Sequence, residues 1–314
     1  MKKEWYAIFF ILFGLPLCVL LIGLLIPLLI NATNQIQNTT EIQEKPDRIV
    51  SLAPNLTEIL FALGLGEKVV AVSTDSDYPP EAASKNKVGT FWQPNTEAIV
   101  AAKPDLVITE CFEQQKSVAA TLHRLGYQVL TLKIESIESM LVAILYIGDA
   151  TGTQNRASQL DQDITNRLNN LRSKLAGIDE VKVLWVVQAE PLRVAGRNTF
   201  LNELIELAGG ENAIGPTIQQ YPPIGTEELL ACGAETIIQS AMGVSNIPEQ
   251  QQAAERFWSK WPTLPAVKNN RIHVIDPNTT LRLGPRLCQG LELVVHRLHP
   301  EIDEHQHETA LRIR

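Results

Sequence analysis

The segment from Thr96 to Thr109 predicts a short helix that leads directly into a buried strand. Thr96 is a good N-cap, Glu97 suits the positive end of the helix dipole, and apolar residues follow at helical spacing. Residues 103–105 (Lys-Pro-Asp) then end the helix, and residues 106–108 (Leu-Val-Ile) form the apolar run of a central parallel strand. A chain with such a segment needs a sheet whose strands alternate with helices.

The segment from Thr226 to Gln239 repeats this order. It starts with threonine and glutamate, continues through an apolar helical stretch and a break, and ends in a β-branched run. Two segments of one design predict two lobes, each with a glutamate at the start of a short helix, Glu97 and Glu227. Taken alone, both glutamates are explained by the stabilisation of their own helices.

Strands and helices alternate over most of the chain, which predicts an α/β fold with mostly parallel sheets. We expect an N-terminal lobe over residues 46–135 and a C-terminal lobe over residues 179–300. Between them, residues 136–178 lack proline and carry apolar residues at helical spacing, so we expect one long, rigid helix that joins the lobes and limits hinge motion. Thr151 and Gly152 mark the point where it would bend or split.

An almost uninterrupted apolar run over residues 5–30 precedes the lobes and follows two lysines. A run of about 20 apolar residues can span a bilayer, and preceding lysines favour a cytoplasmic N-terminus. Residues 1–30 are therefore expected to be a transmembrane anchor or an export signal, followed by a polar tether over residues 31–45. The lobes should lie outside the cytoplasm, in the periplasm or at the cell surface, either anchored to the cytoplasmic membrane or released by cleavage.

Charge and motifs exclude several classes of function. The formal net charge of -8 and the lack of a basic patch argue against nucleic acid as a partner. The sequence has no P-loop, no zinc-ligand spacing and no C-x-x-C pair among its four cysteines, so we expect no cofactor and no metal site. Histidines in and just before the polar tail, residues 301–314, are interpreted as solvated.

Six short motifs share their order and spacing with one known family. They are residues 48–58 (RIVSLAPNLTE), 76–80 (SDYPP), 88–93 (VGTFWQ), 103–108 (KPDLVI), 125–129 (LGYQV) and 208–212 (AGGEN). Together they resemble the helical-backbone (class III) substrate-binding proteins of ABC importers, and most of all the members that bind vitamin B12 (cobalamin). The resemblance covers about residues 46–300.

This resemblance implies a small-molecule ligand in the cleft between two lobes, and no catalysis. It also implies an ABC permease with its ATPase as partner, because in this family a glutamate on each lobe docks onto permease arginines. Glu97 and Glu227 match these two positions. An exposed acid at a helix start is held rigidly enough to pair with a cation on a partner.

Four residues match positions that contact the ligand in the family. Trp92 and Tyr78 match aromatic positions, Tyr221 stands where the relative has a tryptophan, and Arg286 matches an arginine. Flat aromatic side chains suit a flat macrocycle, because stacking buries a large area with little loss of rotamer freedom. Two of these residues have a plainer explanation: Trp92 as a half-buried core aromatic, and Arg286 as an anchor for its loop.

Departures from the family pattern leave the ligand open. Asn278 and Thr279 replace an Asp-Trp pair, residues 110–111 (Glu-Cys) fall where an aromatic is expected after the fourth strand, and residues 192–193 (Leu-Arg) replace another aromatic. The expected ligand is therefore cobalamin or a related corrinoid, with haem or a ferric siderophore as the alternative. Cys232 and Cys288 either form a disulfide or are free thiols.

Two hypotheses from other classes compete with import. A cleft enzyme could use Cys111 as nucleophile, His273 and Glu110 as bases and Asp276 to orient them, although none lies in a catalytic motif. A tethered sensor would keep the ligand cleft but signal to a partner, and it would be indifferent to changes at the two docking glutamates.

Overall fold

The computed structural model describes residues 45–242 and 246–302. The predicted anchor or signal, residues 1–30, lies outside the described residues, as do most of the tether and nearly all of the polar tail. Within the described ranges, no helix is long and apolar enough to cross a membrane.

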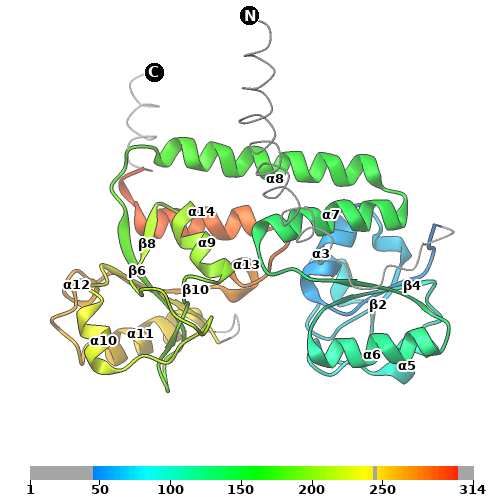
Figure 1. Cartoon of the computed structure of the whole chain (residues 1–314), viewed down its shortest axis with the longest axis horizontal. Helices are drawn as coiled ribbons and strands as arrows, with labels where there is room; N and C mark the ends of the chain where they lie inside the picture. The colour runs from blue at the N-terminus through cyan, green and yellow to red at the C-terminus, as the bar shows by residue number, and fades with distance from the viewer. Residues whose placement is uncertain (1–44, 243–245, 303–314) are drawn as a thin grey trace, which may run out of the picture.

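The N-terminal lobe is a five-stranded parallel sheet with helices packed against it (Figure 1). The strand order is β3-β2-β1-β4-β5, and the central strands β1 and β4 are completely buried, as their apolar sequences predict. In chain order the elements are β1 (Ile49–Ser51), α3 (Pro54–Ala62), η2 (Gly66–Lys68), β2 (Val69–Val72), α4 (Pro80–Ala83), β3 (Asn86–Lys87), α5 (Thr96–Ala101), β4 (Leu106–Glu110), α6 (Glu113–Arg124) and β5 (Gln128–Leu132).

Residues 96–109 fold as predicted into a helix followed by a strand, with one correction at the start. Asn95, and not Thr96, is the N-cap: its Oδ1 accepts a hydrogen bond from the Ala98 backbone N–H at 3.0 Å. Thr96 is instead the first residue of α5, because the Asn95 side chain already accepts a hydrogen bond from a free backbone N–H of the first helical turn. The predicted repeat is confirmed in the other lobe, where helix α10 (Thr226–Ala231) is followed by strand β9 (Thr236–Ser240).

The C-terminal lobe is a mixed sheet. β10, β9 and β6 are parallel, β8 also pairs with β6 in parallel, and β7 is an antiparallel edge strand. In chain order the elements are β6 (Val181–Gln188), β7 (Arg193–Val194), α9 (Phe200–Leu207), β8 (Gly210–Asn212), α10 (Thr226–Ala231), β9 (Thr236–Ser240), α11 (Ile247–Trp258), α12 (Pro265–Lys268), β10 (Ile272–Ile275), α13 (Pro277–Thr280) and α14 (Leu287–Leu298).

The expected long helix over residues 136–178 is divided into two helices that pack against each other. α7 (Ile137–Thr151) ends at Gly152, whose φ of 71° lies in the left-handed region, and α8 (Gln154–Leu175) follows. Gly148 permits the close contact, because a Cβ added there would lie 2.4 Å from the Cβ of Ala157. Figure 1 shows α8 lying across both lobes, so α8 spans them.

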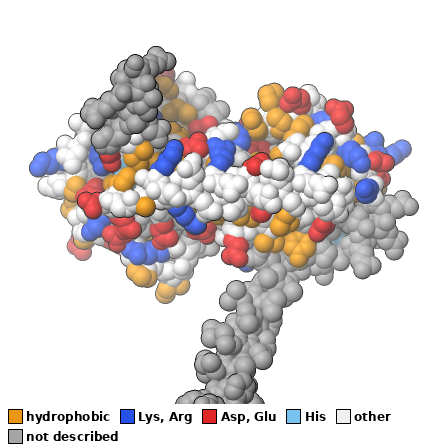
Figure 2. Space-filling view, turned by 90° about the horizontal axis from the view of Figure 1, so that it is seen from above, with side chains coloured by type: hydrophobic (Ala, Val, Ile, Leu, Met, Phe, Trp, Pro, Cys, Tyr) orange, Lys and Arg blue, Asp and Glu red, His pale blue; other side chains and the backbone are white. Residues whose placement is uncertain are grey.

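One apolar core continues through both lobes and the helices between them. It includes Leu56 and Leu106 of the N-terminal lobe, Ile144 of α7, Leu168 of α8 and Leu291 of α14. The outward face of α8 is polar, and Figure 2 shows mostly uncharged polar and charged side chains along it. Because the core is shared, separation of the lobes would expose apolar surface, which opposes large hinge motion.

Candidate functional site

Three aromatic side chains from two segments of the N-terminal lobe form a cluster. Phe91 and Trp92 come from the loop before α5, and Phe112 is the N-cap residue of α6, two residues after the end of β4. The ring centroids lie 4.8 Å apart for Phe91 and Trp92, 5.2 Å for Phe91 and Phe112, and 5.9 Å for Trp92 and Phe112. Trp92 is 59% exposed and Phe112 is 40% exposed, so Trp92 is not a core residue and both rings offer apolar surface to a ligand.

Phe112 was missed in the sequence because the aromatic position after the fourth strand was assigned to residues 110–111. The aromatic ring lies one residue further along the chain. Buried Gln115 holds the cluster, since its Nε2 donates to the Phe91 carbonyl at 2.9 Å. Asp75 Oδ2 accepts from the Phe91 backbone N–H at 2.6 Å. The loop is therefore fixed from two sides.

Tyr78 and Arg286, predicted separately as ligand contacts, lie against each other. The guanidinium carbon of Arg286 is 3.9 Å from the centroid of the Tyr78 ring, which is a cation–π contact. Burial by itself would lower the pKa of Arg286, but hydrogen bonds to Glu58 and the charge of that carboxylate outweigh burial and raise the pKa. The contact joins the loop after β2 in one lobe to the residue before α14 in the other.

Tyr221 is half-buried in the C-terminal lobe and packs against the shared core. Burial raises the pKa of its phenol, so the hydroxyl is protonated at neutral pH. Arg193, which stands at a position where the family has an aromatic, donates from Nη1 to the Tyr221 carbonyl at 3.1 Å. The replacement thus supports the loop that carries Tyr221.

Glu97 and Glu227 are both exposed, at the starts of α5 and α10. Figure 1 places these two helices in different lobes, on the side of the molecule away from α8. Within the described ranges, neither carboxylate forms an ion pair or accepts a hydrogen bond. Both are therefore available to a cation on a partner surface.

Glu110 is a carboxylic acid at the end of β4 that is only 5% exposed. Burial raises its pKa to about 7, the charge of Glu135 contributes to the rise, and a hydrogen bond from Asn55 opposes it. Asn55 Nδ2 lies 2.5 Å from Glu110 Oε1 and also donates to the Leu283 carbonyl at 3.3 Å. This polar group therefore connects the buried end of β4 with the C-terminal lobe.

The groups considered for catalysis do not form one site. Glu110 is the last residue of β4 in the N-terminal lobe and Cys111 follows it, whereas His273 lies on β10 in the C-terminal lobe. Asp276 Oδ1 accepts from the Asn278 backbone N–H at 2.8 Å and caps α13. Its carboxylate therefore serves its own helix.

Cys232 and Cys288 carry free thiols, so the alternative that they form a disulfide is wrong. Cys18 lies outside the described residues. Over residues 45–242 and 246–302, no group of three or more His, Cys, Asp or Glu side chains could hold a metal ion.

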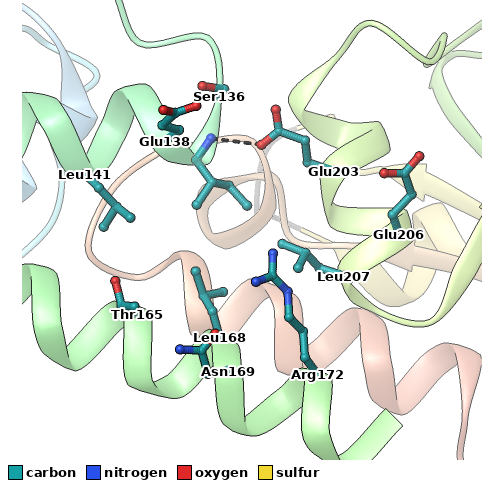
Figure 3. Close-up of a pocket in the computed structure, with 11 residues that line it drawn as sticks. Ser136, Glu138, Leu141, Thr165, Leu168, Asn169, Arg172, Glu203, Glu206 and Leu207 are labelled. Carbon is teal, nitrogen blue, oxygen red and sulfur yellow. Dashed lines mark hydrogen bonds between the residues drawn. The ribbon is translucent and has the colours of Figure 1, made fainter. Parts of the chain in front are cut away.

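A separate hollow of about 570 Å³ lies between α7, α8 and α9 (Figure 3). Glu203 Oε2 accepts from the Ile137 backbone N–H at 2.9 Å, and burial raises the pKa of this glutamate. The charged groups Glu138, Arg172 and Glu206 around the hollow are exposed, and none of the aromatic candidates lines it. The hollow is therefore separate from the aromatic candidates.

The family model for periplasmic binding proteins matches residues 49–279. The chain belongs to the periplasmic binding protein family. This binding protein is 31% identical over 278 residues to an uncharacterised ABC transporter substrate-binding lipoprotein of Bacillus subtilis, YvrC, a match that covers 86% of this chain and 85% of the relative.

Two solved structures show the same fold. The periplasmic vitamin B12-binding protein BtuF of Vibrio cholerae is 28% identical, with a TM-score of 0.70 over 81% of this chain and 96% of its own. The periplasmic heme-binding protein RhuT of Roseiflexus sp. RS-1 is 27% identical, with a TM-score of 0.71 over 82% of this chain and 99% of its own.

These relatives confirm the two-lobe α/β fold and the family expected from the six motifs. The binding protein is a substrate-binding component of an ABC transporter, which works with a permease and an ATPase, and it is not an enzyme. One of these relatives binds vitamin B12 and another binds heme, so membership of the family does not identify the ligand of this protein.

Proposed function

We propose that this binding protein captures cobalamin or a related corrinoid between its lobes, outside the cytoplasm, and delivers it to an ABC permease. The observation that carries the proposal is the exposed pair Trp92 and Phe112. Asp75 links this cluster to the loop that carries Tyr78, and Tyr78 in turn contacts Arg286 of the opposite lobe. Such a site presents flat apolar surface beside polar groups, which suits a macrocycle with polar substituents.

The ligand of one structural relative supports a corrinoid as the ligand of this protein. BtuF of Vibrio cholerae is a vitamin B12-binding protein, and the match covers nearly all of that chain. Trp92 and Tyr78 match its family pattern in sequence, and Phe112 supplies an aromatic ring next to the position where the pattern seemed to be broken. The departure after the fourth strand is thus smaller than the sequence suggested.

Haem or a ferric siderophore is the second candidate, and Tyr78 favours it. Its ring is 40% exposed, and a tyrosine oxygen is an established axial ligand for haem iron. RhuT, the heme-binding relative, supports this reading with similar coverage. Haemin and corrinoids must therefore be compared directly.

Glu97 and Glu227 are proposed to dock the loaded protein onto arginines of the permease. Both carboxylates are exposed on helices at the same side of the molecule, one in each lobe, so both can be engaged at once (Figure 1). A sensor that signals to another partner would not depend on these two charges. Residues 5–30 are proposed to hold the lobes at the membrane, or to be removed after export.

An absorbance-monitored titration of the full chain in mild detergent tests the ligand. Cyanocobalamin, cobinamide, haemin and a ferric siderophore are added separately. Saturable, near-stoichiometric binding of a corrinoid is the expected result. Binding of haemin or the siderophore without binding of a corrinoid would refute the corrinoid while retaining the transport role.

A further inference from the structure

Glu58 is a charged residue among the buried residues of helix α3. It lies in α3 next to Ile59 and Leu60, which are completely buried, and its own side chain is only 2% exposed. A buried carboxylate is unfavourable unless it is paired and hydrogen-bonded. The partners of Glu58 therefore decide whether this helix can pack where it does.

Both partners of Glu58 come from the other lobe. Arg286 donates from Nε to Oε2 at 2.9 Å and from Nη2 to Oε1 at 2.5 Å, which is a two-point contact. Arg282 Nη1 lies 3.4 Å from Glu58 Oε1. One carboxylate of the N-terminal lobe thus holds two arginines of the segment between β10 and α14.

The same two arginines hold the loop that carries Tyr78. Arg282 Nη1 donates to Asp77 Oδ1 at 2.6 Å, and Arg282 Nη2 donates to the Asp75 carbonyl at 3.3 Å. Arg286 lies over the Tyr78 ring. Burial works against ionisation of Asp77, but the hydrogen bond and charge of Arg282 outweigh it and lower the pKa of Asp77. The loop, the arginines and Glu58 form one connected network.

The donors of Arg286 are largely used inside this network. Nε and Nη2 bond to Glu58, and Nη2 also donates to the Asn278 carbonyl at 3.2 Å. A guanidinium held in this way supports a neighbouring ring better than it binds a mobile anionic group of a ligand.

We propose that Glu58 is the positioning residue of the ligand site. Its buried carboxylate fixes Arg286 against the Tyr78 ring and fastens residues 276–286 of the C-terminal lobe to the N-terminal lobe before a ligand arrives. Arg286 acts through Tyr78 and not by direct contact with the ligand. The effect on ligand binding rests on the proposed function, whereas the fastening of the lobes does not.

Hydrogen exchange of the full chain in detergent tests the fastening without any ligand. Glu58→Gln should accelerate exchange by about tenfold or more in two peptides from different lobes, residues 73–79 and 276–286, and leave α7 and α8 unchanged. Arg286→Lys should give the same pattern, because lysine keeps the charge but loses the two-point contact. This variant also serves if Glu58→Gln does not fold.

Arg167→Gln is the matched control. It breaks the exposed pair between Arg167 and Glu292, which joins α8 to α14, and it should change neither peptide. The proposal would be overturned if, in both Glu58→Gln and Arg286→Lys, the two peptides exchanged at the same rate as in the wild type.

Titration with cyanocobalamin and with haemin tests the positioning role. Whichever probe the wild type binds, Glu58→Gln should weaken binding by about tenfold or more, and it should have no further effect in a Tyr78→Ala background. Unchanged affinity, or equal losses with and without Tyr78, would overturn positioning through Tyr78. If the wild type binds neither probe, the proposed ligand fails, and the exchange experiment still decides the fastening.

Discussion

Replacement of Glu110 by glutamine should raise the stability of the protein, relative to the wild type, more at pH 8 than at pH 5. Burial at the end of β4 raises the pKa of Glu110 from 4.5 to about 7. Between these values the folded protein holds a proton that the unfolded chain has released, so the wild type loses stability as the pH rises from 4.5 to 7. Above pH 7 the carboxylate is charged in both states, and the destabilisation is complete.

The magnitude follows from the size of the pKa shift. The difference between 7 and 4.5 is about 2.5 units, and one unit corresponds to about 1.4 kcal/mol, so the full destabilisation is about 3 kcal/mol. Most of it, about 2 to 3 kcal/mol, develops between pH 5 and pH 8. Glutamine is neutral at both values, and its amide oxygen can still accept the hydrogen bond from Asn55.

Urea unfolding followed by tryptophan fluorescence measures the effect. The difference in unfolding free energy between Glu110→Gln and the wild type is determined at pH 5 and at pH 8. The contributions of the other titrating groups are the same in both proteins and cancel in this difference. Glu113→Gln is the matched control, because it removes a highly exposed carboxylate from the next helix. A difference between Glu110→Gln and the wild type that is the same at both pH values would refute the reasoning.

Three further results are expected. Trp92→Ala should weaken ligand binding by about tenfold or more and change the unfolding free energy by about 0.5 kcal/mol or less, since the ring is exposed; unchanged affinity in the absorbance titration would argue against the aromatic site. Charge reversal of Glu97 and Glu227 together should abolish uptake but leave ligand affinity intact, and normal uptake would exclude the docking proposal. Burial and the neighbouring positive charges lower the pKa of His273 from 6.5 to about 4, so the wild type should lose stability as the pH falls through this range and His273→Gln should lose less; parallel unfolding curves would contradict this.

Local sequence patterns were sufficient to predict the helices and strands of the fold. The strand predicted over residues 106–108 lies within β4, and the helix–strand segment at residue 96 recurs at residue 226 as expected. These predictions succeeded because apolar runs, breaks and caps act over a few residues. The N-cap was misplaced by one residue because Asn95 and Thr96 are both good caps, and only the backbone conformation selects between them.

Longer-range packing divided the helical stretch after residue 136. Its composition permits one helix throughout, but Gly152 allows a left-handed turn and Gly148 allows close contact with Ala157. The resulting pair of helices buries apolar surface that one straight helix would leave exposed. The predicted point of division at residues 151–152 was right, while the single long helix was not.

The sequence by itself determined the alternation of strands and helices, the two-lobe design, the exposed glutamates at two helix starts and the aromatic loop at Trp92, because each depends on neighbours along the chain. Tertiary structure alone decided which polar groups meet. Glu58 and Arg286 are 228 residues apart and form a buried two-point ion pair, and Glu110 acquires its raised pKa from burial. Charge pairing and desolvation depend on distance in space, which sequence order does not specify.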